Sequence, residues 1–228
     1  MLESALPRRA LFAAGGAVAG SIALSTPSTA STRRPTTPRA ALQALLDGNR
    51  RFVAGHAHHP RQSPGRIRAV AAGQDPFAIV LGCADSRVPP EVLFDQGLGD
   101  LFDNRIAGNV VDDLLLGSIE YAVAEFAPPL LLVLGHERCG AVTATLDAIR
   151  TGTTPPGHIA DLVDVLRPVL TPYADVPDGV ERGVRANIRA QARALRSRSD
   201  IVREAVERGG TALLGARYDL DTGVVTVL

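Results

Sequence analysis

The stretch PFAIVLGC, residues 76–83, decides the fold: it is a continuous apolar run of strand length that ends in a cysteine. A similar run, PLLLVLGH at 129–136, ends in a histidine, and residues 100–108 (DLFDNRIAG) predict a further strand. Unbroken apolar runs are typical of strands that are buried on both faces of a sheet. Helical patterns at 112–126 and 139–152 alternate with these runs, which indicates crossover connections. The sequence therefore predicts an α/β fold with a mainly parallel central β-sheet flanked by helices.

Other segments complete the predicted domain. Residues 39–55 space apolar side chains as a helix does, which predicts an N-terminal helical arm suited to lying on a partner subunit. A short helix is expected at 66–72, and two more at about 158–170 and 178–198. The last of these has an arginine-rich face that we interpret as solvated. Residues 211–228 predict two strands joined by Asp-Leu-Asp-Thr-Gly, a hairpin at the edge of the sheet.

The N-terminus has the pattern of an export signal. Residues 1–30 contain the adjacent Arg8 and Arg9, a mildly apolar run and a small-residue cleavage site, which resembles a twin-arginine signal peptide. The apolar run is shorter than the roughly 20 residues that span a bilayer. We therefore expect no stable membrane span after cleavage, with an uncleaved single anchor as the alternative. The expected location is bacterial and exported: periplasmic, in the cell envelope or secreted. Residues 31–38 predict a linker, and 39–228 a single domain.

The bulk composition favours a small partner molecule. The chain has 228 residues, of which 46% are hydrophobic and 21% charged, the composition of an ordinary globular protein. Its 24 basic and 24 acidic residues balance. A balanced charge produces no large field of one sign, which argues against nucleic acid or an anionic membrane as the partner.

Metal-capable side chains end two of the predicted strands. Cys83 follows the first apolar run and His136 ends the other, so in a parallel sheet both face the same crevice. Cys139 follows His136 by one helical turn and is expected to begin a helix, whose N-terminus favours a thiolate. Two sulfurs and one imidazole suit tetrahedral zinc, one ion per chain, and leave a fourth position open for water, as in catalytic sites. The alternative is a Cys83–Cys139 disulfide in an oxidising compartment.

Two charged residues close to Cys83 suggest a catalytic dyad. If the backbone stays extended, Asp85 and Arg87 project to the same side as Cys83. Arg87 could then clamp the carboxylate of Asp85 by a bidentate contact and hold it off the metal. Asp85 would be free to accept a hydrogen bond from a zinc-bound hydroxide. The remaining histidines lie in loop-like or helix-start sequence and are expected to be exposed rather than ligating: His56, His58, His59 and His158.

These motifs resemble those of the β-class carbonic anhydrases. The resemblance rests on CADSRVPPE (83–91) with GHERCGAV (135–142), and it extends through FDQGLGDLF, RIAGNVV, GSIEYAV and GARYDLDTG to cover roughly residues 40–228. It implies a single catalytic domain in which Cys83, His136 and Cys139 are the zinc ligands. It also implies that Asp85 and Arg87 form the catalytic dyad, and that Asp85 moves onto zinc in the closed state that some members adopt.

The resemblance further implies a substrate pocket and an assembly. Gln74 matches a glutamine that binds carbon dioxide or bicarbonate from across a dimer interface, and Phe102 and Tyr121 match apolar pocket positions. The backbone near Gly140 would contact a substrate oxygen. A homodimer is the implied minimal unit, often paired into larger homo-oligomers. The chain contains no Trp, which favours the constitutively open subtype over the pH-gated one. One departure is that Asp103 and Asn104 stand where the family usually has apolar strand residues.

The predicted function is the reversible hydration of carbon dioxide to bicarbonate and a proton by a zinc-bound hydroxide. One alternative is the hydrolysis of carbon disulfide or carbonyl sulfide at the same site. The other is a non-catalytic zinc- or bicarbonate-binding protein, which the presence of both Asp85 and Arg87 disfavours.

Overall fold

The computed structural model describes residues 34–228. The predicted export signal (1–30) and the first part of the predicted linker (31–38) lie outside the described residues. Among residues 34–228, no helix combines the length and the apolar character needed to cross a membrane.

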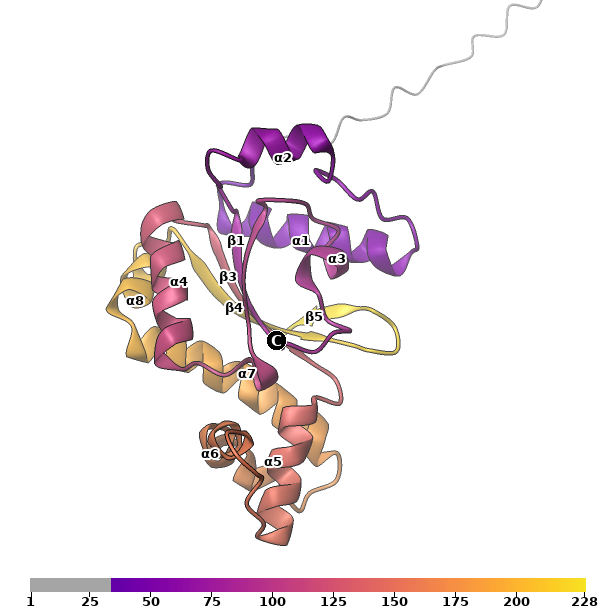
Figure 1. The fold of residues 1–228 in the computed structure, drawn as a ribbon, viewed down its shortest axis with the longest axis vertical. Coiled ribbons are helices and arrows are strands. Elements are labelled where there is room, and N and C mark those ends of the chain that lie inside the picture. The colour runs from indigo at the N-terminus through magenta and orange to yellow at the C-terminus, as the bar shows by residue number, and fades with distance from the viewer. Residues whose placement is uncertain (1–33) are drawn as a thin grey trace, which may run out of the picture. The chain divides into compact units, whose positions relative to one another are not determined.

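A five-stranded sheet, in the order β2-β1-β3-β4-β5, forms the centre of the described chain (Figure 1). Its strands are β1 (Ala78–Gly82), β2 (Leu101–Arg105), β3 (Leu130–His136), β4 (Ala212–Tyr218) and β5 (Val225–Val227). The first four strands are parallel and β5 pairs antiparallel with β4. The predicted fold class is therefore confirmed, as is the hairpin at the edge.

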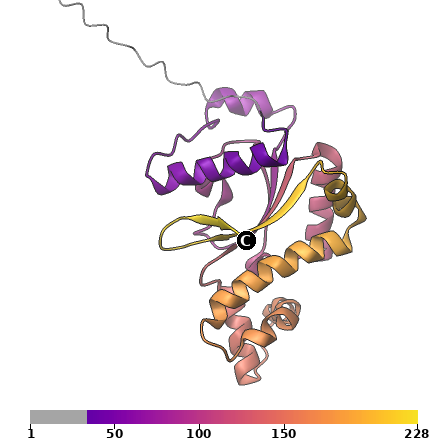
Figure 2. The same ribbon diagram turned by 180° about the vertical axis from the view of Figure 1, so that it is seen from behind.

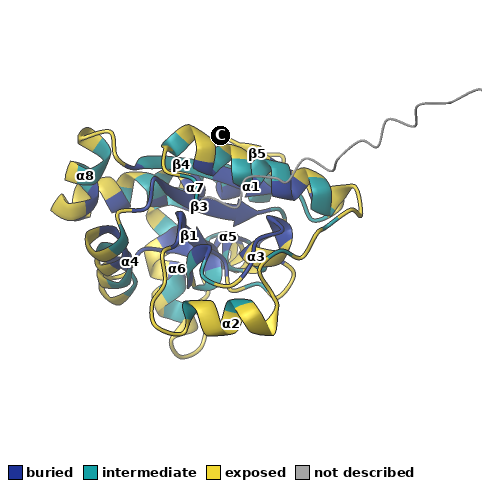
Figure 3. Cartoon of the chain, turned by 90° about the horizontal axis from the view of Figure 1, so that it is seen from above, coloured by how far each residue is buried: buried dark blue, intermediate teal, exposed yellow. Residues whose placement is uncertain are grey.

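The two central strands are buried along their whole length, as their unbroken apolar sequences predict. Figure 3 shows β1 and β3 in dark blue between the helices. Alternate strand residues enter two separate hydrophobic cores, with Ile79 and Leu131 on one side and Val80 and Leu132 on the other. A parallel sheet covered on both faces places its loops, and any site they build, at the carboxyl edge.

Eight α-helices and two 3-10 turns cover the sheet within the described residues. They are α1 (Pro38–Val53), α2 (Pro64–Val70), α3 (Pro90–Leu93), η1 (Ala107–Asn109), α4 (Asp113–Phe126), α5 (Gly140–Thr151), α6 (Ile159–Leu170), η2 (Thr171–Tyr173), α7 (Gly179–Arg198) and α8 (Asp200–Glu207). α4 to α8 supply the core on one face, and α1 with α3 supplies the other. In Figure 2 the yellow strand β4 runs between α1 in indigo and α7 in orange.

Local sequence explains where several helices begin. The Thr37 side chain accepts a hydrogen bond from the Ala40 amide, and Pro38 occupies the first helical position of α1. Asp112 caps α4 in the same way. The sequence did not predict α3 or α8. α8 is separated from α7 by Ser199, an extended residue whose side chain caps the new helix by accepting from the Val202 amide.

Candidate metal centre

The carboxyl ends of β1 and β3 bring three metal-capable side chains together. Cys83 directly follows β1, His136 is the last residue of β3, and Cys139 directly precedes α5. Their sulfur and nitrogen atoms all lie within 4.8 Å of one another, and all three residues are buried. Both cysteines are free thiols in this structure rather than a disulfide. Segments far apart in sequence thus converge on one point, as the parallel topology predicts.

The donor atoms of this cluster fit a zinc ion. His136 Nδ1 lies 2.9 Å from the Glu137 carbonyl oxygen, which fixes the proton on Nδ1 and leaves a lone pair on Nε2. That Nε2 atom is buried and has no hydrogen-bond partner among residues 34–228. A buried, unpaired nitrogen facing two sulfurs is costly unless a cation binds it. Two thiolates and one imidazole form the donor set that tetrahedral zinc prefers.

The sulfurs of the two cysteines lie within 4.8 Å of each other and shift each other's pKa in opposite directions. This close contact with Cys139, helped by the amides of Asp85 and Gly108, lowers the pKa of Cys83 to about 4 against the opposing effect of burial. The same contact, with burial, raises the pKa of Cys139. A divalent cation bound here would replace the proton that the two sulfurs share, so that both could bind it as thiolates.

Asp85 lies beside the cluster and accepts hydrogen bonds from Arg87. Arg87 Nε donates to Asp85 Oδ1 at 2.9 Å, and Nη2 donates to Oδ2 at 2.8 Å. The Arg87 amide donates to Oδ1 as well, at 2.9 Å. These contacts, above all those from the guanidinium, hold the pKa of Asp85 well below its usual range. Asp85 Oδ2 lies 3.8 Å from His136 Nε2, so an ionised carboxylate borders the place where the three donors point.

The backbone does not stay extended through Arg87, and that expectation is wrong. Ser86 and Arg87 form a turn, in which the Val88 amide donates to the Asp85 carbonyl at 3.1 Å. The Asp85 side chain stabilises this turn because it accepts from the amide two residues on. The bidentate contact is present, but a turn rather than strand alternation produces it.

Two further residues contact Cys83, and neither was assigned a role from the sequence. Arg105, at the end of β2, donates from Nε to the Cys83 carbonyl at 3.0 Å and from Nη2 to the Asp85 carbonyl at 2.7 Å. The amide of Gly108, in η1, donates to Cys83 Sγ at 3.4 Å. Arg105 could have been suspected because it lies in the strand predicted over 100–108, near the same edge of the sheet. Nothing in the sequence around Gly108 indicated that its amide would contact Cys83.

The residues expected to line a substrate pocket do not all lie near the cluster. Gly140 begins α5 and directly follows Cys139. Gln74 is exposed and precedes β1, at the end of that strand opposite to Cys83. Phe102 of β2 and Tyr121 of α4 have ring centroids 6.3 Å apart and pack with Phe126 at the outer edge of the sheet. The remaining histidines are exposed: His56, His58, His59 and His158.

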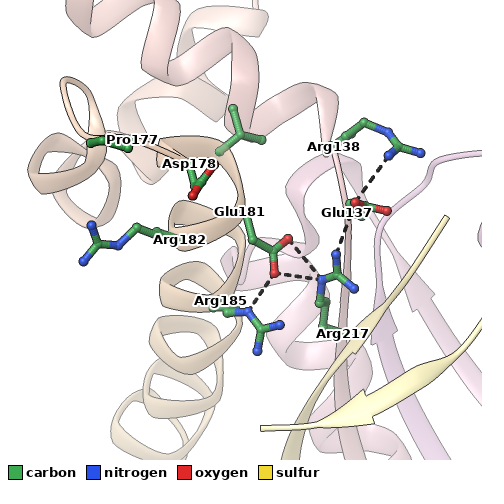
Figure 4. A pocket seen from close by; sticks show the side chains of 9 residues that line it. Glu137, Arg138, Pro177, Asp178, Glu181, Arg182, Arg185 and Arg217 are labelled. Carbon is green, nitrogen blue, oxygen red and sulfur yellow. Dashed lines mark hydrogen bonds and ion pairs between the residues drawn. The ribbon is translucent and has the colours of Figure 1, made fainter. Parts of the chain in front are cut away.

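A cavity of about 710 Å³ lies beside the loop that links His136 to Cys139. Figure 4 shows Arg217 of β4 between Glu137 of this loop and Glu181 of α7. Its Nη2 lies 3.4 Å from Glu137 Oε1, its Nε 2.9 Å from Glu181 Oε1, and its Nη1 2.8 Å from Asp219 Oδ2. Because Glu137 and Glu181 of the cavity wall already pair with arginines, we assign these contacts to holding the ligand loop in place.

Comparisons with known proteins agree on one family. A family described as carbonic anhydrase matches residues 78–225. Carbonic anhydrase 2 of Mycobacterium tuberculosis is 47% identical over 189 residues, which are 82% of this chain and 91% of that protein. The β-carbonic anhydrase of Coccomyxa, solved with acetazolamide, is 30% identical with a TM-score of 0.64, covering 82% of this chain and 86% of that one. A tetrameric β-carbonic anhydrase of Sordaria macrospora is 26% identical with a TM-score of 0.65, covering 82% and 96%.

Proposed function

The chain belongs to the β-class carbonic anhydrases, and we propose that it catalyses the reversible hydration of carbon dioxide at a zinc ion held by Cys83, His136 and Cys139. The observation that carries this proposal is the buried, unpaired Nε2 of His136, which faces two free cysteines next to the Asp85–Arg87 pair. Zinc, when bound, supplies the Lewis acidity that lets water attack carbon dioxide near neutral pH.

The surrounding residues have separate tasks. The Glu137 carbonyl orients the imidazole of His136, so that its Nε2 lone pair points at the two sulfurs. Arg87 keeps Asp85 ionised and holds it beside the ligand set, with Oδ2 3.8 Å from His136 Nε2, which supports a role for Asp85 next to the metal rather than as its fourth ligand. Asp85 accepts a hydrogen bond from the attacking water and thereby directs the oxygen lone pair toward carbon dioxide. The backbone amide of Gly140, which directly follows the ligand Cys139, is the group that we propose donates a hydrogen bond to a substrate oxygen.

A pair of variants at the site tests this proposal. Cys83→Ser should lose zinc and activity together, because it removes a ligand. Asp85→Asn should keep zinc and lose turnover by about 100-fold or more, the usual contribution of a positioned proton acceptor. Zinc content and stopped-flow hydration of carbon dioxide are the measurements, with carbon disulfide as the comparator substrate. Pure protein without zinc, or normal hydration by Asp85→Asn, would contradict the respective assignment.

A second copy of the chain would complete the pocket. Among residues 34–228, β2 is an edge strand that pairs with β1 alone, and Tyr121 beside it is half exposed. Gln74, Phe102 and Tyr121 lie away from Cys83 in one chain, so they support a pocket built across a dimer. The solved relative from Sordaria macrospora is a tetramer. Tyr121→Arg should give a monomer in analytical ultracentrifugation and lower activity with its zinc retained; an active dimer would contradict this arrangement.

Export is a separate proposal that rests on residues 1–30. Their charged, apolar and small-residue regions follow the order of a cleaved signal. The mature chain should therefore begin near residue 31 outside the cytoplasm. N-terminal sequencing of protein recovered from a bacterial host's periplasm or medium measures this, and a chain that still begins at Met1 there would favour the uncleaved anchor.

A further inference from the structure

We propose that Asn187 and Gln191 of α7 are positioning residues for the metal ligand Cys83, acting through the segment that carries Gly108. This inference rests on the proposed metal site and adds to it two residues that touch none of the three ligands. It concerns the strength and character of the Cys83 thiolate as a ligand, rather than the reacting atoms.

The chain of hydrogen bonds that links α7 to the metal site begins at the sulfur of Cys83. Gly108 donates its amide to Cys83 Sγ at 3.4 Å, and its carbonyl accepts from Asn187 Nδ2 at 2.8 Å. Gly108 is thus held from both sides: by the sulfur at its amide and by α7 at its carbonyl. Asn187 is buried at 1% exposure, so no water competes for this contact. A buried hydrogen bond with both partners fixed strongly limits where the Gly108 amide can point.

Gln191, one helical turn farther along α7, adds two more hydrogen bonds to this network. Its Nε2 donates to Asn187 Oδ1 at 2.8 Å, which fixes the orientation of the Asn187 amide. Its Oε1 accepts from the Val111 amide at 3.0 Å. The two side chains, four residues apart on one helical face, therefore hold the segment at Gly108 and again at Val111.

The held segment has an unusual backbone. Gly108 has φ +72° and the next residue, Asn109, has φ +44°, so two consecutive residues adopt the left-handed region. A non-glycine residue there is held in a sparsely populated conformation. An added Cβ at Gly108 would lie 3.1 Å from both Ala141 Cβ and Leu166 Cδ1. Contacts from outside the segment are therefore needed to keep this shape, and the α7 side chains supply them.

The hydrogen bond from Gly108 to Cys83 should affect how the sulfur binds a metal. An amide that donates to a thiolate withdraws charge from the sulfur and orients its lone pairs. Loss of outer-shell partners of this kind typically costs 10- to 100-fold in metal affinity. Without Asn187, the Gly108 amide would no longer be held toward Cys83, and both the zinc affinity and the electronic character of the metal–sulfur bond should change.

The chain offers a matched control for ordinary loss of stability. Asn49 of α1 is also buried, and its Nδ2 donates to the carbonyls of Leu93 and Gly223 while its Oδ1 accepts from the Val225 amide. It lies in the opposite core and makes no hydrogen bond to any residue of the metal cluster or to Gly108. Asn49→Asp and Asn187→Asp make the same chemical change in equally buried places, and Asn187→Asp keeps the Oδ1 that Gln191 uses.

The experiment compares the full chain with Asn187→Asp, Gln191→Met and Asn49→Asp. Gln191→Met adds no charge and covers the case in which Asn187→Asp does not fold. Zinc dissociation constants come from competition with a chromophoric chelator, and the cobalt-loaded proteins report the thiolate-to-cobalt charge-transfer band. We expect Asn187→Asp and Gln191→Met to weaken zinc binding about 10-fold or more and to shift the band, whereas Asn49→Asp changes neither and lowers only the unfolding midpoint.

Two results would overturn the inference, and they differ. If the wild type binds metal and the α7 variants match it or match Asn49→Asp in affinity and band position, Asn187 and Gln191 have a purely structural role. If the wild type binds neither zinc nor cobalt, the proposed metal site itself fails and the inference fails with it.

Discussion

At the scale of single residues, the Asp85–Arg87 pair shows how geometry and charge act together. The carboxylate accepts three hydrogen bonds, all from one neighbour two residues away. Two of them come from the planar guanidinium, which matches a carboxylate in a way that an ammonium group does not. The position of Asp85 next to His136 therefore depends on the shape of Arg87 as well as on its charge.

Arg87→Lys tests this dependence. Lysine keeps the positive charge but loses the bidentate contact, so Asp85 should be less firmly held in its position beside the ligand atoms. We expect zinc content to be unchanged and kcat/KM for carbon dioxide to fall by about tenfold or more, equivalent to about 1.4 kcal/mol of transition-state stabilisation. Wild-type kcat/KM in this variant would show that charge alone suffices.

Asp103 is a carboxyl group whose surroundings oppose its ionisation. It lies on β2 near Glu91, and its Oδ1 is buried without a hydrogen-bond partner in the described chain. Burial, and then the negative charge of Glu91, raises its pKa to about 8, although Arg105 acts in the opposite direction. The folded chain therefore holds this proton more tightly than the unfolded chain, whose aspartates have a pKa of about 3.9. Stability from this group is present at low pH and is lost as the pH rises from about 4 to about 8.

Asp103→Asn removes that titration. The free energy of unfolding of the variant should fall less between pH 5 and pH 8 than that of the wild type, so the difference between them grows with pH. Urea unfolding at both pH values and at one protein concentration measures it. Asp175→Asn, at an exposed carboxylate, is the control and should run parallel to the wild type. Parallel curves for Asp103→Asn would mean that Asp103 is already ionised at pH 5.

The ligands were predictable from the sequence, and their supports were not. Cys83 and His136 follow apolar runs that could only be buried strands, and parallel strands end at one edge, so their convergence follows from topology. Asn187 and Gly108, by contrast, are 79 positions apart, and no local pattern signals which amide an asparagine will contact. The turn at Ser86 was missed because the prediction supposed an extended backbone from Cys83 to Arg87 and did not consider Asp85 as a turn former.

At the scale of elements, the close packing of α1 on α3 is the most restrictive contact on its face of the sheet. A Cβ added at Gly48 of α1 would lie 1.6 Å from the Phe94 carbonyl oxygen at the end of α3. Neither partner can give way, because the obstacle is backbone. The N-terminal arm predicted over 39–55 therefore belongs to the core of its own chain.

Gly48→Ala should displace α1 and lower the free energy of unfolding by about 2 kcal/mol or more, as overpacking typically does. Gly65→Ala in α2 is the control, because its Cβ would meet only the Ser63 Oγ atom, at 3.6 Å; it should leave stability the same or slightly higher. Guanidinium unfolding of both variants provides the comparison. Equal stability of the two variants would show that α1 shifts without cost.

At the scale of the whole molecule, the metal cluster joins three separate parts of the chain: the end of β1, the end of β3 and the start of α5. An ion that binds there binds the folded state only. When free zinc is a hundredfold above its dissociation constant, this linkage adds about 2.7 kcal/mol to the free energy of unfolding. For a chain of this size that raises the melting temperature by roughly 5 to 10 °C.

Chelation should therefore lower the melting temperature by that amount, and added zinc should restore it. Differential scanning calorimetry measures the shift. Cys83→Ser, which lacks a ligand, should show no zinc-dependent shift at all. If neither chelator nor zinc changed the melting temperature of the wild type, this would contradict a zinc site that contributes to folding.

The position of β3 in the sheet has a consequence for how the protein is made in the cell. β3 is apolar along almost its whole length and pairs with β1 on one side, but its other neighbour, β4, begins only at Ala212. At about 5 to 20 residues per second, a ribosome needs several seconds to pass from His136 to that strand. During this interval the edge of β3 that later pairs with β4 has unpaired backbone N–H and C=O groups, which can pair with other chains. Chaperones that shield growing chains should therefore govern its recombinant yield more strongly than they govern the stability of the finished enzyme.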